Sequence, residues 1–169
     1  MVTCYMVYNG DMQFNRKNQL TMQALSDVMD IVYTEKIRED EGGTYGVGVN
    51  GNLSNRPKES FMFLIGFNTN KDMYEKLMGI AKAEHQNVAN NGPRPEDLKK
   101  VQEFLVKKHA EDLENNRYWM NCIQTNDCDG YNPMANYVDM INSITSEDVA
   151  NMAKAVLNGY NKEVVQIPE

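Results

Sequence analysis

The sequence holds few of the residues that build metal or nucleophile sites. It has two histidines in 169 residues, His85 and His109, and neither begins an H-E-x-x-H or H-x-x-E-H pattern. A zinc site on a helix needs such spacing because its ligands must face one metal. The three cysteines, Cys4, Cys122 and Cys128, match neither a zinc knuckle nor a redox C-x-x-C motif. We therefore expect no metal site in this chain, Cys4 in the core, and both histidines on exposed helix faces.

Positive charge and long apolar runs are also scarce. Lys and Arg total 17 against 24 Asp and Glu, which gives a net charge of −7. Nucleic-acid-binding proteins usually carry a basic patch, and none stands out here, so we expect no nucleic-acid partner. No apolar run approaches the roughly 20 residues that span a membrane, so we expect no membrane segment. The first residues, Met1 to Tyr5, lack the basic start and cleavage site of a signal peptide.

The residues that are present predict one globular domain over residues 1–169, with 41% hydrophobic residues. Alternation and β-branched or aromatic content predict strands at Val2–Tyr8, Thr44–Leu53, Ser60–Phe67 and Glu163–Ile167. Apolar residues at three-to-four spacing predict helices at Asn18–Ile37, Lys71–Asn90, Pro95 to about Asn115 with helical character again over Tyr118–Gln124, and Ser146–Leu157.

These elements follow the order β-α-β-β-α-α-α-β. The natural packing for that order is an α+β fold with two layers, an antiparallel sheet with helices on one face. Gly42 and Gly43 are expected to end the first helix, because glycine accepts the left-handed cap conformation at little cost. Thr145 and Asp148 have the spacing of a capping box at the start of the last helix.

A glycine-rich segment joins the first helix to the second strand. It runs from Arg38 to Gly48 and reads R-E-D-E-G-G-T-Y-G-V-G. The six residues from Gly46 to Gly51 also match G-x-G-x-x-G, the dinucleotide-binding pattern. That site requires a strand, then the glycines, then a helix. Here a helix comes first and a strand follows, so we do not interpret the segment as a nucleotide site.

Arg38 and Tyr45 are the candidate functional residues of this segment. Arginine offers several fixed donors to peptide carbonyls, and a tyrosine hydroxyl can bind a carbonyl or an oxyanion. The pair could hold a peptide backbone but could not hydrolyse it alone. The other interpretation is structural, with a helix-terminal arginine that satisfies carbonyls or carboxylates and a half-buried strand tyrosine.

The same segment resembles the signature of the C-terminal half of M16 metallopeptidases, the insulinase/pitrilysin family. The likeness rests on Arg38-Glu39-x-x-Gly42-Gly43-Thr44-Tyr45-Gly46-Val47-Gly48 and extends over nearly the whole chain. Further segments that look like the family's are Asn91–Pro93 with Leu98–Val101, Asn115–Trp119, Ile144–Val149 and Val164–Glu169.

The resemblance implies the M16 or processing-peptidase-like metallohydrolase fold, in which α/β halves enclose a peptide chamber. In active members the N-terminal half carries zinc in an inverted H-x-x-E-H motif. The C-terminal half supplies an arginine-tyrosine pair that holds the substrate near the metal. Arg38 and Tyr45 match that pair as substrate-binding residues, and Tyr45 also as a catalytic donor to a carbonyl or oxyanion.

This chain is thus expected to be an excised C-terminal domain of a bacterial zinc metalloendopeptidase, in the periplasm or the cytoplasm. Its partners would be the zinc-bearing N-terminal half, in the same chain or a partner subunit, and a peptide substrate. The chain alone would bind no cofactor and would be inactive. Arg94 departs from the family, because a helix-capping Ser or Thr is expected before Pro95.

Two other functions remain open at this point. The chain could be a structural or assembly domain of an M16 relative that has lost its activity. It could also be an independent peptide-binding module.

Overall fold

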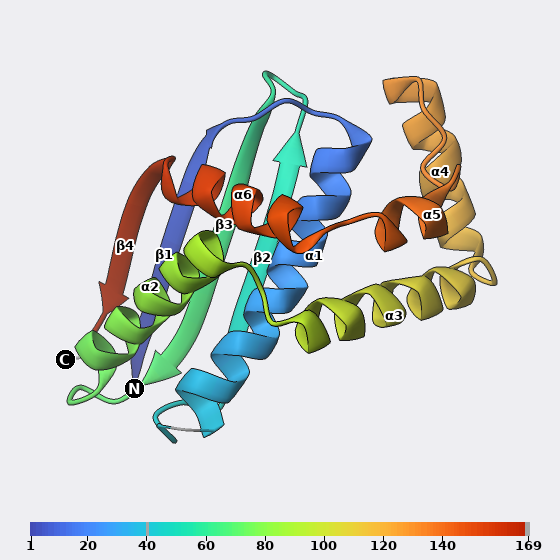
Figure 1. Cartoon of the computed structure of the whole chain (residues 1–169). Helices are drawn as coiled ribbons and strands as arrows, with labels where there is room; N and C mark the ends of the chain where they lie inside the picture. Colours follow the sequence, from blue (N-terminus) through green and yellow to red (C-terminus); the bar gives the residue numbers. More distant parts are fainter. Residues whose placement is uncertain (40, 168–169) are drawn as a thin grey trace.

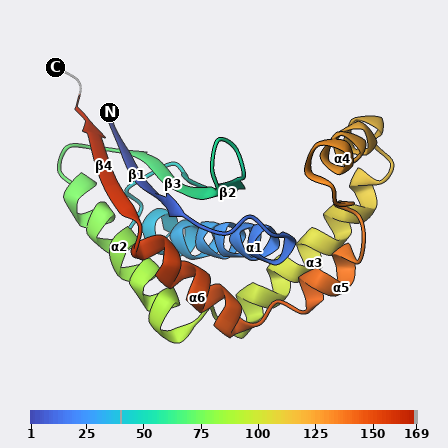
Figure 2. The same cartoon turned by 90° about the horizontal axis from the view of Figure 1, so that it is seen from above.

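The computed structural model describes residues 1–39 and 41–167. Asp40 of the glycine-rich segment and the last two residues of the C-terminal likeness, Pro168 and Glu169, lie outside the described residues. Most of the helices gather on one face of an antiparallel sheet, and α4 (Asn116–Asp129) stands apart beyond the side of the sheet that β2 (Val47–Ser54) forms (Figures 1 and 2). The predicted α+β two-layer fold is confirmed.

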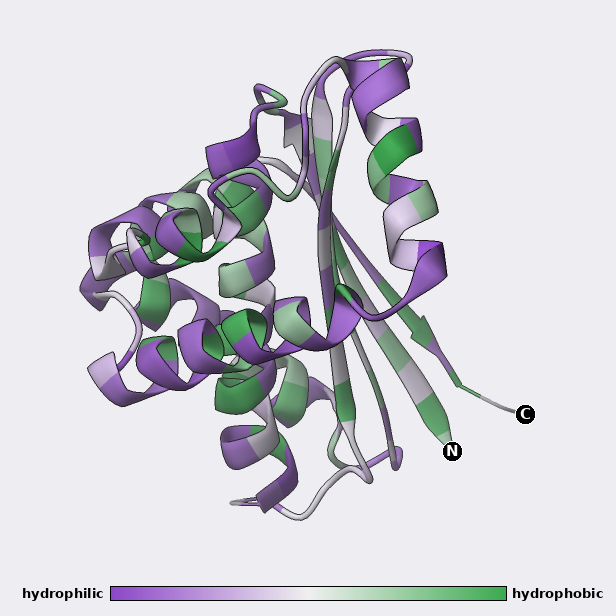
Figure 3. Ribbon diagram, turned by 90° about the vertical axis from the view of Figure 1, so that its right-hand side faces the viewer, coloured by the Kyte–Doolittle hydropathy of each residue, from purple (hydrophilic) through white to green (hydrophobic). Residues whose placement is uncertain are grey.

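The strands described are β1 (Val2–Asp11), β2 (Val47–Ser54), β3 (Ser60–Thr69) and β4 (Tyr160–Gln166), in the spatial order β2-β3-β1-β4. Alternating side chains give the sheet one buried face, since Cys4 and Met6 of β1 and Phe63 and Ile65 of β3 are completely buried. Tyr5 points to the opposite, open face. In Figure 3 hydrophobic segments lie on the strands and on the inner turns of the helices beside the sheet, and further ones lie on the helix that stands apart from the layer.

The first helix, α1 (Arg16–Tyr33), covers the buried face. Its N-cap is Asn15, whose side-chain oxygen accepts a hydrogen bond from the Asn18 amide at 2.8 Å. The helix therefore begins two residues before the predicted start. It continues into a π-helical turn, η1 (Thr34–Glu39). Gly42 then adopts φ +61° and donates to the Arg38 carbonyl at 3.1 Å, so the predicted glycine stop is confirmed.

The second strand begins at Val47, three residues after the predicted start at Thr44. The Thr44 hydroxyl donates to the Gly46 carbonyl at 2.9 Å and accepts from the Gly46 amide at 3.3 Å. This local turn takes the backbone bonds that a strand would use. Tyr45 therefore lies in a bend outside the sheet, which corrects the predicted boundary.

After β3 the described residues form five helices: α2 (Tyr74–Asn91), α3 (Pro95–Asp112), α4 (Asn116–Asp129), α5 (Tyr137–Asn142) and α6 (Ser146–Leu157). The predicted order has three helices between the third and fourth strands, and this number is wrong. Asn115 caps α4 through a hydrogen bond from the Arg117 amide at 2.9 Å and separates it from α3. The capping box of Thr145 and Asp148 is confirmed.

Both histidines are buried, which overturns the prediction of exposed faces. The exposed fraction is 0% for His85 and 9% for His109. His85 extends the apolar stripe of α2, because it lies four residues after the buried Ala81. His109 follows the buried Leu105 of α3 by the same interval. Helix period alone thus places both rings inward.

None of the described helices is long and apolar enough to cross a membrane. Cys4 is buried in the core as predicted, and the three cysteines are free.

Candidate functional site

Arg38 lies in the π-helical turn η1. Short π-helical segments occur frequently at functional sites. Its side chain is exposed. Within the described residues, the guanidinium of Arg38 makes no hydrogen bond or ion pair, while its carbonyl accepts the Gly42 amide. Its donors are therefore available to a ligand, contrary to the structural interpretation in which they satisfy carbonyls or carboxylates.

Tyr45 lies within the turn that Thr44 and Gly46 close, and the residue is 92% exposed. It is not the half-buried strand residue of the structural interpretation. Beside it is a cavity of about 560 Å³ at the end of the sheet. The lining residues come from the glycine bend, the end of β3 and the N-terminus: Met1, Gly42, Gly43, Thr44, Tyr45, Asn68, Thr69, Asn70 and Lys71.

The bend that presents Tyr45 is fixed to the domain by its backbone. The Thr69 hydroxyl donates to the Gly43 carbonyl at 2.6 Å and joins the bend to the end of β3. A Cβ atom at Gly43 would lie 2.7 Å from Met73 and 2.9 Å from Leu77. A side chain at Gly43 would therefore have to displace the ends of the Met73 and Leu77 side chains at the start of α2.

The structure places Arg38 in η1 and Tyr45 in the bend before β2, and it does not join them. No hydrogen bond links their side chains in the described part of the chain, and Arg38 does not line the cavity beside Tyr45. A ligand that reached both would have to span the bend, as an extended peptide can.

Sequence reasoning missed a charged network that reaches η1, the turn that also carries Arg38. Arg94 donates from Nε to Asp97 Oδ2 at 2.6 Å and from its two terminal nitrogens to Glu35 at 3.2 and 2.5 Å. The hydrogen bonds from Arg94 lower the pKa of Glu35 below its usual range. The spacing of Arg94 and Asp97 was a visible signal for the local pair, but the contact with η1 spans 59 residues.

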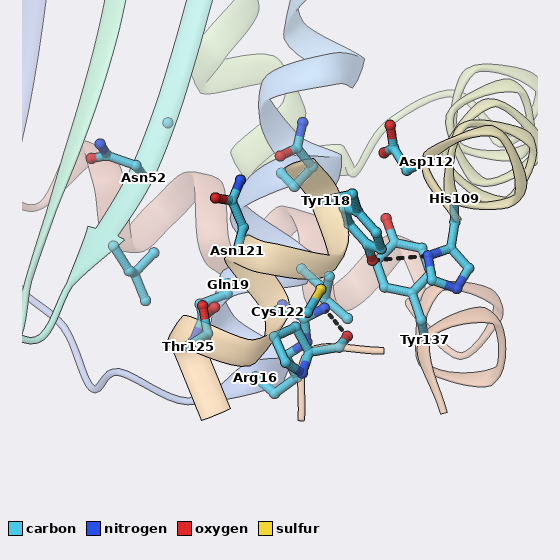
Figure 4. Close-up of a pocket in the computed structure, with 15 residues that line it drawn as sticks. Arg16, Gln19, Asn52, His109, Asp112, Tyr118, Asn121, Cys122, Thr125 and Tyr137 are labelled. Carbon is cyan, nitrogen blue, oxygen red and sulfur yellow. Dashed lines mark hydrogen bonds between the residues drawn. The ribbon is translucent and has the colours of Figure 1, made fainter. Parts of the chain in front are cut away.

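A second cavity, of about 400 Å³, lies toward the other end of β2 between α1 and α4 (Figure 4). His109 stacks on Tyr137 with centroids 4.2 Å apart, and its Nδ1 lies 3.1 Å from the Tyr118 hydroxyl. Burial lowers the pKa of His109 and raises that of Tyr118 to about 12. Cys122 is the one buried residue of α4. We assign this cluster to holding α4 against α3 and α5.

Among the described residues, no group of three or more His, Cys, Asp or Glu side chains could hold a metal ion. The donor set of the described chain therefore does not fit zinc.

Comparison with known proteins decides the family. The profile described as the peptidase M16 inactive domain matches residues 2–105. The chain belongs to the M16 peptidase family. No curated protein matches it in a sequence search.

Solved structures share the fold of this M16 domain at low identity. The periplasmic protease PqqL from Escherichia coli superposes with a TM-score of 0.83 and 16% identity over 99% of this chain and 19% of its own. A mutant of the ferredoxin protease FusC, in complex with Arabidopsis ferredoxin, superposes with a TM-score of 0.81 and 12% identity. That match covers 99% of this chain and 19% of the FusC chain. The peptidase M16 inactive domain from Pseudomonas fluorescens superposes with a TM-score of 0.72 and 18% identity. That match covers 97% of this chain and 40% of the other. The M16 domain described here thus spans about a fifth of the length of PqqL and FusC.

Proposed function

We propose that this chain is the non-zinc C-terminal domain of a zinc metalloendopeptidase, which closes the peptide chamber and holds the substrate backbone. Arg38 would donate to substrate carbonyls. Tyr45 would donate its hydroxyl to a carbonyl or to the oxyanion of the tetrahedral intermediate. The zinc would supply the activated water and would be bound in the N-terminal half, in the same chain or a partner subunit. The chain alone would be inactive.

The exposure of both side chains carries this proposal. A solvent-exposed tyrosine outside the sheet and an arginine without a partner among the described residues contribute little to the stability of the fold. The hydrogen bond from Thr69 to the Gly43 carbonyl ties the bend that carries Tyr45 to the end of β3, which reduces the conformational entropy that this bend loses when a peptide binds. FusC was solved in complex with ferredoxin, which supports a polypeptide as the ligand class.

The alternative is a structural or assembly domain of an inactive M16 relative. Exposed apolar residues on α4, Trp119, Met120 and Ile123, favour a partner surface in either case.

The test combines this chain with the zinc-bearing half of its parent protease, here called the two-half enzyme, and measures cleavage of an unstructured peptide. Arg38→Ala should raise KM by about tenfold or more, the scale of losing a charged hydrogen bond. Lys107→Ala, at an exposed lysine of α3, is the control and should leave KM unchanged. Zinc-dependent cleavage that is insensitive to Arg38→Ala would reject the holding role. Absence of a zinc motif from both the parent chain and any partner subunit would favour the assembly role.

A further inference from the structure

Arg94 occupies the N-cap position of α3 without acting as a cap. Its backbone has φ −59° and ψ 137°, and its side chain makes no capping hydrogen bond. The guanidinium instead bridges two carboxylates from different elements, Asp97 of α3 and Glu35 of η1. The residue that departs from the expected Ser or Thr therefore has another task.

Asp97 anchors this bridge. Its side chain is completely buried, and its charged contacts are the Arg94 Nε at 2.6 Å and the Lys100 ammonium at 4.0 Å. A buried carboxylate without a cation is strongly unfavourable, so Asp97 holds Arg94 in place. The planar fork of arginine then presents two parallel donors to the Glu35 carboxylate, which fixes direction as well as distance.

Glu35 lies in the π-helical turn that also carries Arg38. Ile37 is the one buried residue of η1. The turn continues directly from α1 and also contacts α2 and β2. The Arg94–Glu35 pair adds a tie to α3 one residue after the turn begins, and this tie limits a shift of η1 that would redirect Arg38.

We propose that Arg94 is a positioning residue that sets the direction of Arg38 by clamping η1 to the N-terminus of α3. The inference rests on the proposed function, in which Arg38 holds a peptide carbonyl. Arg94 itself touches no substrate. It acts through Glu35 and the backbone of η1.

A double-mutant cycle in the two-half enzyme tests this role. Arg94→Ala should raise KM for an unstructured peptide about tenfold, the scale of a small misplacement of a binding group, with little change in kcat. In the Arg38→Ala background the same substitution should have no further effect, because the residue it positions is gone. Lys99→Ala is the control and should leave KM unchanged. It removes the exposed ion pair in α3 between the Lys99 ammonium and the Glu103 carboxylate, which lie 3.8 Å apart.

Two more variants separate positioning from stability. Arg94→Lys keeps a cation beside Asp97 but loses the fork, so KM should rise while the unfolding midpoint stays near that of wild type. Glu35→Gln leaves the Arg94–Asp97 pair intact and should reproduce the rise in KM even if Arg94→Ala fails to fold. Hydrogen exchange of the amides of residues 35–39 should accelerate in both variants, and exchange in α2 should not.

The outcomes are distinguishable. If Arg94→Lys or Glu35→Gln raised KM as much in the Arg38→Ala background as in the wild-type background, the positioning role would be overturned. The proposed function would stay intact. Unchanged exchange in η1 would also overturn it. An Arg38→Ala enzyme with wild-type KM would overturn both.

Discussion

The imidazole of His85 lies with its centroid 5.4 Å from that of Phe63, in a core position with no exposed surface. Tyr8 packs against the same ring at 5.5 Å, edge to face. Neither ring nitrogen makes a well-formed hydrogen bond, and the nearby carbonyl of Ala153 offsets the burial only in part. Burial therefore lowers the pKa of His85 from 6.5 to about 4.

This depressed pKa predicts a loss of stability in mild acid. The unfolded chain takes up the proton near pH 6.5, before the folded chain does, so stability is complete above 6.5 and declines as the pH falls toward 4. A gap of about 2.5 in pKa corresponds to about 3 kcal/mol. Urea unfolding at pH 7.5 and pH 4.5 should show most of this loss.

His85→Leu provides the control for that measurement. It keeps an apolar side chain of similar size and has no proton to bind, so its stability should change much less between the two pH values. It should also be at least as stable as wild type at pH 7.5, because it removes two buried nitrogens that make no well-formed hydrogen bond. An undiminished acid loss in His85→Leu would assign the effect to other groups.

Gly42 and Gly46 offer a matched pair of glycines in the same bend. A Cβ atom would meet no atom within 4 Å at either position, but Gly42 alone of the two has a left-handed φ, +61°. Gly42→Ala should lower the free energy of unfolding by about 1 kcal/mol through backbone strain. Gly46→Ala should leave it unchanged or slightly raised, since it only restricts the unfolded chain. If thermal unfolding showed the same loss of stability for Gly42→Ala and Gly46→Ala, the assignment of Gly42 as the helix cap would be contradicted.

The capping box predicts a cost for Thr145→Ala. The Thr145 hydroxyl accepts the Asp148 amide at 3.1 Å, and the Asp148 carboxylate accepts the Thr145 amide at 3.0 Å. Loss of the cap should lower the free energy of unfolding by about 1 kcal/mol. Asn151→Ala, at an exposed position in the interior of α6, should be neutral or slightly stabilising. Denaturant unfolding of both variants in parallel is the measurement.

Tyr45→Phe tests the catalytic hydroxyl in the two-half enzyme. Because the residue is 92% exposed, the substitution should not change stability. If the hydroxyl acts in the transition state, kcat/KM should fall by about 10- to 1,000-fold. Tyr160→Phe, at an exposed tyrosine of β4, is the control. Wild-type kinetics for Tyr45→Phe would reject the hydroxyl's role.

The fold followed from patterns that act locally. Alternation in β1 and β3 and the three-to-four stripes of α1, α2 and α6 report burial directly, so the layers were predictable. The division between α3 and α4 was not, because Asn115 is an N-cap within a stretch that otherwise looks helical. The six residues of α5 are too few for a period to be visible.

The candidate site was predictable in residues but not in geometry. The identities and spacing of Arg38 and Tyr45 follow from the sequence, whereas the exposure of Tyr45 depends on a threonine side chain that takes over strand hydrogen bonds. The interaction of Arg94 with Glu35 joins residues 59 positions apart. Spacing rules describe neighbours on one element, and such a contact depends on how two elements pack.

The adjacency of β1 and β4 has an engineering consequence. Thr3 pairs with Gln166, so the first and last strands run side by side and bring both described ends of the chain to one place (Figure 2). A linker of a few glycines would close the polypeptide into a ring, and the short connection at Leu113–Asn115 could then be cut without removing a strand from the sheet. A circular permutant opened there should fold to the same packing with α4 as its first element.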